Sequence, residues 1–97
     1  MYKIVLSESS KNDLNYILEI IFRFTFNQDS VDRLYNEIVS QIYSLQIFPN
    51  RYVEYKYWLR VLNIRWKYKV FYKVNENKQE VQIYRILFSA NNYENIF

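Results

Sequence analysis

The sequence predicts an α+β fold in which a helical hairpin packs on one face of a mostly antiparallel, twisted sheet. In the first half of the chain, apolar residues recur at the spacing of buried helical stripes, and beyond Pro49 they alternate with polar residues as in strands. A chain of 97 residues is long enough for one hydrophobic core. We therefore expect a single domain over residues 1–97 with the element order β-α-α-β-β-β.

The N-terminal strand is expected over Tyr2–Leu6, which is a short apolar run. Residues 7–10 supply serines as helix N-cap candidates and a glutamate for the first helical turn. A first helix is predicted from about Ser9 to about Phe26, because its apolar positions fall on one face. These positions are Leu14, Ile17, Leu18, Ile21 and Phe22, with Thr25.

A second helix is predicted from the polar segment 27–30 to about Leu45. Its apolar positions again share one face, and they are Val31, Leu34, Tyr35, Ile38, Ile42 and Leu45. Because only a few residues connect the two helices, they should form an antiparallel hairpin. Pro49 is the only proline in the chain and should end the helical half.

Three further strands should complete the sheet. They are expected at about Tyr57–Leu62, at residues 66–74 and at Glu80–Phe88, with a turn at 75–78. In the middle strand, Trp66, Tyr68, Val70, Tyr72 and Val74 alternate with Lys67, Lys69, Phe71 and Lys73. The first set should face the helices, which leaves the lysines on an uncovered sheet face that could receive a ligand.

Positive charge is concentrated in the second half of the chain. Residues 1–50 carry four bases and six acids, whereas residues 51–97 carry nine bases and four acids. Within residues 55–74, six Lys or Arg are interleaved with seven aromatic residues and no acid. This pattern suits nucleic acid, or a protein that receives nucleic acid, as the partner. The alternative is a strand ladder with solvated lysines and core aromatics.

Two missing residue types narrow the chemistry. The chain has no cysteine and no histidine, which excludes a thiolate nucleophile, a sulfur-based zinc site and the usual acid–base group at neutral pH. We expect no metal and no cofactor, so any catalysis must use Lys, Arg, Tyr, Glu or Asp. No run approaches the ~18 apolar residues of a membrane span, and we expect a cytoplasmic protein without a membrane partner.

Several motifs, in their order and spacing, resemble the RelE/ParE superfamily of bacterial type II toxins over nearly the whole chain. They are Tyr2-Lys3-Ile4-Val5-Leu6-Ser7, Asp13-Leu14, Leu45 before Phe48-Pro49, Arg60-Val61-Leu62, Tyr68-Lys69-Val70-Phe71-Tyr72 and Val81-Gln82-Ile83-Tyr84-Arg85-Ile86-Leu87. The resemblance implies a growth-inhibiting toxin, of a kind associated with plasmid stabilisation, held in a hetero-oligomer by a cognate antitoxin. We expect an antitoxin helix along the helical hairpin and an added strand at a sheet edge.

The superfamily has two branches with different targets. RelE-like members cleave mRNA on the ribosome with basic residues and a Tyr or His, and ParE-like members inhibit DNA gyrase. On the ribonuclease branch, the resemblance implies Lys69, Arg60, Arg85 and Tyr93 as catalytic residues. The arginine expected soon after the last strand is missing, since Ser89-Ala90-Asn91-Asn92 stands there. A developing phosphorane charge needs cations where it forms, so this departure counts against a ribonuclease.

The ending Arg85-Ile86-Leu87-Phe88-Ser89-Ala90 is more similar to the ParE branch, with Phe88 in place of a frequent His. The resemblance therefore favours a ParE-like toxin that targets gyrase, and the alternative is a ribosome-dependent mRNA endoribonuclease. A member that has lost its activity and only binds its antitoxin is a third possibility. The candidates for target or nucleic-acid binding are Arg65, Lys67, Lys69 and Lys73.

Overall fold

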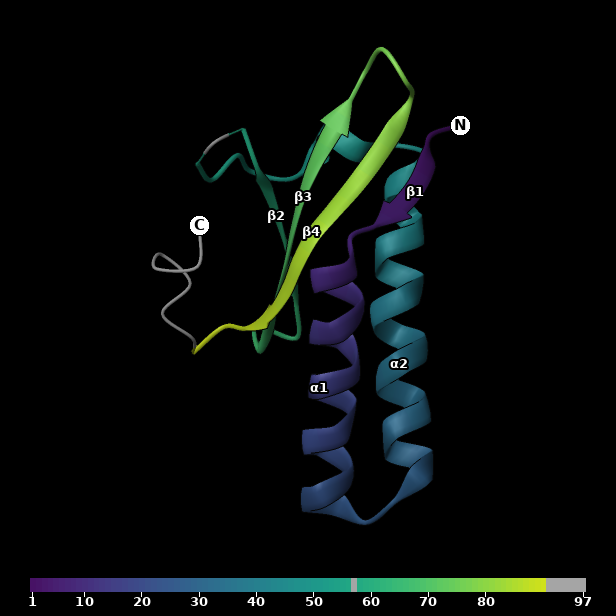
Figure 1. Cartoon of the computed structure of the whole chain (residues 1–97), viewed down its shortest axis with the longest axis vertical. Coiled ribbons are helices and arrows are strands. Elements are labelled where there is room, and N and C mark those ends of the chain that lie inside the picture. Colours follow the sequence, from purple (N-terminus) through teal and green to yellow (C-terminus); the bar gives the residue numbers. More distant parts are fainter. Residues whose placement is uncertain (57, 91–97) are drawn as a thin grey trace.

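The computed structural model describes residues 1–56 and 58–90 of the chain. Two antiparallel helices lie beside an open sheet of four strands (Figure 1). The elements are β1 (Lys3–Leu6), α1 (Glu8–Thr25), α2 (Gln28–Tyr43), β2 (Arg60–Ile64), β3 (Tyr68–Asn75) and β4 (Glu80–Phe88), with short 3-10 helices at Ser44–Gln46 and Pro49–Arg51. The α+β fold and the element order expected from the sequence are confirmed.

The sheet has the strand order β1-β4-β3-β2. Strand β1 runs parallel to β4, and the other two pairs are antiparallel, so the sheet is mostly antiparallel as predicted. The register between β3 and β4 shifts at Phe71 and Tyr72, which face Arg85 and Ile83, so β4 carries one extra residue there. Such a bulge bends the strand and lets it follow the neighbouring helix.

Both helices begin at side chains that cap them. The Ser7 hydroxyl accepts a hydrogen bond from the backbone N–H of Ser10 at 3.0 Å, and the Asn27 side chain accepts from Asp29 and Ser30. These contacts satisfy N–H groups that have no partner within the helix. Among the described residues, neither helix combines the length and the apolar character needed to traverse a bilayer.

The hydrophobic core lies between the helical hairpin and one face of the sheet. Its buried side chains are Leu14, Ile17, Leu34, Ile38, Ile42, Leu45, Leu62, Ile64, Tyr68, Val70, Tyr72, Val81, Ile83 and Ile86. Tyr72 is fully buried, and its hydroxyl donates a hydrogen bond of 2.7 Å to the carbonyl of Pro49. Burial raises the pKa of Tyr72 to about 12. The predicted inward face of the middle strand is therefore confirmed at Tyr68, Val70 and Tyr72.

Two predicted strand starts are wrong. The middle strand begins at Tyr68 and not at residue 66, and the strand before it covers Arg60–Ile64 and not Tyr57–Leu62. Trp66, which was expected to face the helices, is 84% exposed in the turn between β2 and β3. Arg65 and Trp66 both have positive φ there, a backbone shape that normally calls for Gly or Asn. Because this chain has no glycine, the usual turn signal is missing from the sequence.

The sheet face opposite the helices is less open than the sequence suggested. Phe71 points to this face, yet it is fully buried, and its ring packs edge-on against Tyr55 with 5.6 Å between centroids. The backbone N–H of Val61 also donates to the carbonyl of Val53, which holds this segment beside β2. Residues 53–55 therefore cover part of the sheet face that was expected to be uncovered.

Candidate functional site

Lys69 projects from the sheet face opposite the helices. It lies in β3 between the core residues Tyr68 and Val70, and strand alternation sends its side chain the other way. Its amine donates a hydrogen bond of 2.6 Å to the side-chain oxygen of Asn63, its register partner in β2. Within residues 1–56 and 58–90, the amine of Lys69 pairs with no carboxylate. Lys69 thus carries an uncompensated positive charge.

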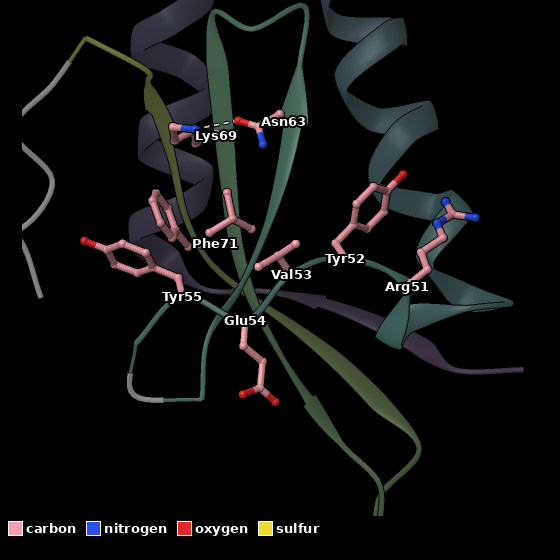
Figure 2. A pocket seen from close by; sticks show the side chains of 9 residues that line it. Arg51, Tyr52, Val53, Glu54, Tyr55, Asn63, Lys69 and Phe71 are labelled. Atoms are coloured by element: carbon pink, nitrogen blue, oxygen red, sulfur yellow. Dashed lines mark hydrogen bonds between the residues drawn. The ribbon is translucent and has the colours of Figure 1, made fainter.

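A cavity of about 320 Å³ lies beside Lys69 (Figure 2). It is lined by Arg51, Tyr52, Val53, Glu54, Tyr55, Val61, Asn63, Lys69 and Phe71. Two strands of the sheet and the segment before β2 therefore build it together. Figure 2 shows the polar pair of Lys69 and Asn63 on one side, with the rings of Phe71 and Tyr55 next to them.

The charges around the cavity favour an anionic ligand. Glu54 points away from Lys69 in Figure 2 and pairs with Arg60 at 3.4 Å. Arg51 donates to the hydroxyl of Ser44 and lies over the ring of Tyr52, with 5.0 Å to its centroid. An acidic side chain or a phosphate could meet the amine of Lys69 while an apolar or aromatic group lies against Phe71. In the part of the chain that the structure describes, no group of acidic side chains is arranged to hold a metal ion.

Arg60, a candidate catalytic residue, has a structural role on the other face of the sheet. Its register partner is the core residue Tyr72, so its side chain lies on the helix side. The guanidinium donates to the backbone carbonyls of Tyr52 at 2.6 Å and Asn50 at 3.2 Å, and it pairs with Glu54. Arg60 therefore stabilises the position of the segment before β2, and it does not line the cavity beside Lys69.

Arg85, a second candidate catalytic residue, joins β4 to α1. Its guanidinium makes two hydrogen bonds of 2.7 and 2.8 Å to the carboxylate of Asp13. The same carboxylate accepts the backbone N–H of Ile86 at 3.0 Å, next to the bulge in β4. The hydrogen bond to Asp13 raises the pKa of Arg85. Arg85 is therefore held in an ion pair with Asp13.

The three candidate catalytic residues that the structure describes do not form one cluster. Lys69 lies in the cavity, Arg60 lies on the opposite sheet face, and Arg85 is held by Asp13 on α1. Tyr93 lies outside the described residues. A ribonuclease site built from these side chains is therefore not assembled among residues 1–56 and 58–90.

The remaining binding candidates lie in different surroundings. Arg65 sits in the β2–β3 turn and forms an ion pair with Glu37 of α2, so most of its charge is already compensated. Lys67 is exposed in the same turn. Lys73 is on the same sheet face as Lys69, four residues further along β3, and is half-buried. Lys69 is the one among these four that lines the cavity.

Sequence reasoning missed Asn63, Tyr55 and Phe71 as members of this site. Asn63 could have been found from the hairpin, since a polar residue directly opposite Lys69 is its nearest side-chain neighbour. Tyr55 could not have been found, because the sequence of residues 51–59 follows neither a helical nor a strand period. Nothing in it indicates that this segment folds back over β3. The sequence predicts Phe71 on the same sheet face as the lysines, but its burial there depends on the contact with Tyr55.

No protein-family model and no curated protein sequence matches this chain. Solved structures do match it. The chromosomal ParDE TA system from P. aeruginosa has a TM-score of 0.76 and 22% sequence identity, covering 89% of this chain and 94% of that chain. The chain has the RelE/ParE fold.

Two RelE structures share the RelE/ParE fold at lower similarity. The intact E. coli RelBE toxin-antitoxin complex has a TM-score of 0.60 and 12% identity, over 95% of this chain and 100% of that chain. The isolated E. coli RelE toxin has a TM-score of 0.60 and 11% identity, and the match covers 99% of this chain and 93% of the RelE chain. The TM-scores and sequence identities of both RelE structures are lower than those of the ParDE system, in agreement with the ParE-like resemblance of the sequence.

Proposed function

We propose that this chain is the toxin of a bacterial type II toxin–antitoxin pair and that a cognate antitoxin neutralises it. The observation that carries the proposal is the RelE/ParE fold, matched over 89% of the chain with a TM-score of 0.76 to a ParDE system. The order of motifs along the sequence supports it independently. A second match, to the RelBE toxin-antitoxin complex, agrees with an antitoxin as the partner.

We further propose that the toxin acts by binding, as a ParE-like inhibitor of DNA gyrase. A ribonuclease has to surround the scissile phosphate with cations that are already in place. Arg60 and Arg85 are instead occupied by structural contacts, on a different face and on a different element from Lys69. The dispersed cations support a binding protein over a nuclease.

In this proposal, the cavity beside Lys69 is the contact with the target. The Lys69 amine, fixed by Asn63, would pair with an acidic group of the gyrase complex, and the rings of Tyr55 and Phe71 would pack against its apolar neighbours. A half-buried charge pair of this kind contributes more to complex lifetime than an exposed one does. Lys69 should therefore be more important than the exposed lysines.

A supercoiling assay with purified gyrase and purified protein tests this proposal. The unmodified chain should inhibit supercoiling, and Lys69→Ala should weaken inhibition about tenfold or more, because a charged contact of at least about 1.4 kcal/mol is lost. Lys78→Ala is the matched control, since Lys78 is exposed in the β3–β4 turn and should leave inhibition unchanged. Full supercoiling in the presence of the unmodified chain would contradict a gyrase inhibitor.

The alternative function is a ribosome-dependent mRNA endoribonuclease. It is favoured by one observation, which is that an amine, an amide and aromatic rings line one cavity and could hold a phosphate and a base. The same protein preparations can be added to translating ribosomes, and transcript ends can be mapped. Cleavage that depends on Lys69, together with normal gyrase activity, would replace the binding proposal with this alternative.

A further inference from the structure

Arg51 is a second cation at the cavity beside Lys69. It ends the short 3-10 helix Pro49–Arg51, and its side chain lines the cavity together with Lys69. Figure 2 shows Arg51 and Lys69 well apart, with Val53 between them. Val61 is a further apolar side chain of the lining. The two positive charges therefore lie on either side of an apolar part of the cavity.

Both cations are held in place by neutral groups. Arg51 donates to the hydroxyl of Ser44 and lies over the ring of Tyr52, whereas Lys69 donates to the side-chain oxygen of Asn63. Among the described residues, neither cation forms an ion pair with a carboxylate. A neutral partner fixes a cation without cancelling its charge, so both cations can still pair with anionic groups.

Other cations of the sheet region pair with acids of this chain. Arg60, Arg65 and Arg85 each form an ion pair with a carboxylate. Glu54 is the acid among the described residues that line the cavity, and it is the partner of Arg60 at 3.4 Å. The charges that remain for a ligand of the cavity are therefore positive.

The aromatic rings of the cavity offer little open surface to a nucleotide base. Phe71 is fully buried, and the ring of Tyr55 packs edge-on against it. The guanidinium of Arg51 lies over the ring of Tyr52. Recognition of a base by stacking needs an open ring face. Two cations around an apolar centre therefore favour carboxylate side chains of a protein over the phosphates and bases of a nucleic acid.

We infer that the cavity takes an extended protein segment in which two acidic residues flank an apolar one. One carboxylate pairs with Lys69 and the other with Arg51, whose planar guanidinium matches a carboxylate. The apolar side chain between them lies against Val53 and Val61. The inference rests on the proposed function in that the segment belongs to the target of the toxin. Arg51 is then a second binding residue beside Lys69.

Short peptides with two glutamates test this inference on the purified full chain. One, two or three residues, including a leucine, separate the glutamates, and each peptide is matched by two peptides in which one glutamate is replaced by glutamine. Binding is followed at low salt by the amide chemical shifts in NMR spectra. At one of these spacings, the doubly acidic peptide should bind about tenfold tighter than either singly acidic peptide, because a second charge-assisted contact forms.

Substitutions of the two cations identify where the second contact forms. Arg51→Ala and Lys69→Ala should each abolish the preference for the doubly acidic peptide, whereas Arg51→Lys keeps the charge and should retain most of it. The matched control is Arg33→Ala, which removes an exposed arginine of α2 outside the cavity and should leave the preference unchanged. Spectra that match the unmodified chain away from the cavity establish that the variants are folded.

Three outcomes would overturn the inference. One is equal binding of doubly and singly acidic peptides by the unmodified chain, and another is a preference that persists in both Arg51→Ala and Lys69→Ala. The third is tighter binding of a short single-stranded oligonucleotide than of every peptide, which would assign the cavity to nucleic acid. The gyrase assay is separate from these titrations. Normal supercoiling together with the peptide preference would remove gyrase as the target and leave the class of ligand, and gyrase inhibition without the preference would overturn only this inference.

Discussion

Three cationic side chains of the sheet, Lys69, Arg60 and Arg85, differ in what they contact. Lys69 alternates with core residues of β3, and its amine therefore lies on the sheet face away from the helices. Its hydrogen bond to Asn63 follows from the register of the hairpin. Arg60 and Arg85, which the resemblance implied as catalytic residues, each use the guanidinium group in contacts within the fold. A cationic residue in an apolar strand therefore indicates that its charge is paired within the protein, and the structure identifies the group with which it pairs.

Tyr72 should make stability sensitive to alkaline pH. Burial raises its pKa to about 12, above its ordinary value of about 10. The folded state therefore keeps the phenolic proton more tightly than the unfolded state does. This stabilisation is complete below about pH 10 and is lost as the pH rises towards about 12. Urea denaturation across this range should show a steeper fall in the free energy of unfolding for the unmodified chain than for Tyr72→Phe.

Tyr16→Phe is the control for this measurement, because Tyr16 is 57% exposed and should not change the pH dependence. Equal slopes for the unmodified chain and Tyr72→Phe would show that the buried hydroxyl does not control alkaline stability.

The helices and strands differ in how well their limits could be predicted. The helix starts were found to within one or two residues, because Ser7 and Asn27 are recognisable capping residues. The start of β4 at Glu80 was predicted correctly, whereas β2 and β3 begin at Arg60 and Tyr68, later than predicted. For β3 the reason is that the turn before it is made by Arg65 and Trp66 without glycine. The burial of Phe71 by Tyr55 was not predictable, since the sequence before β2 shows neither helical nor strand periodicity.

The contact between α1 and β4 should depend on Asp13. Asp13→Asn removes the charge that holds the Arg85 guanidinium and weakens the bond to the N–H of Ile86. The side chains of Arg85 and Asp13 are 29% and 12% exposed, so solvent screens the lost charge only in part. We expect a loss of about 2–3 kcal/mol in the free energy of unfolding, measured by urea denaturation.

Asp32→Asn is the matched substitution for this test. Asp32 is exposed on α2 and accepts one hydrogen bond from Gln28, so the change should stay within about 0.5 kcal/mol. Equal effects of the two substitutions would contradict a special role for the Asp13–Arg85 pair in joining α1 to β4.

The whole molecule separates its charges along its length. The helical end is nearly neutral and aromatic, whereas the sheet end carries most of the basic residues and the cavity beside Lys69. This arrangement allows the two ends to bind different partners. In the proposed function, the sheet end meets the target. The overall RelE/ParE fold was predictable from the order of weak motifs, because a fold depends on the sum of many patterns.

The proposed toxin is tested most directly by inducing the chain in bacterial cells while growth and the supercoiling of a resident plasmid are followed together. The account predicts that the unmodified chain arrests growth and relaxes the plasmid, and that Lys69→Ala, present as folded protein in equal amount, does neither. Normal growth with abundant folded unmodified chain, or arrest that is equally strong with Lys69→Ala, would contradict it.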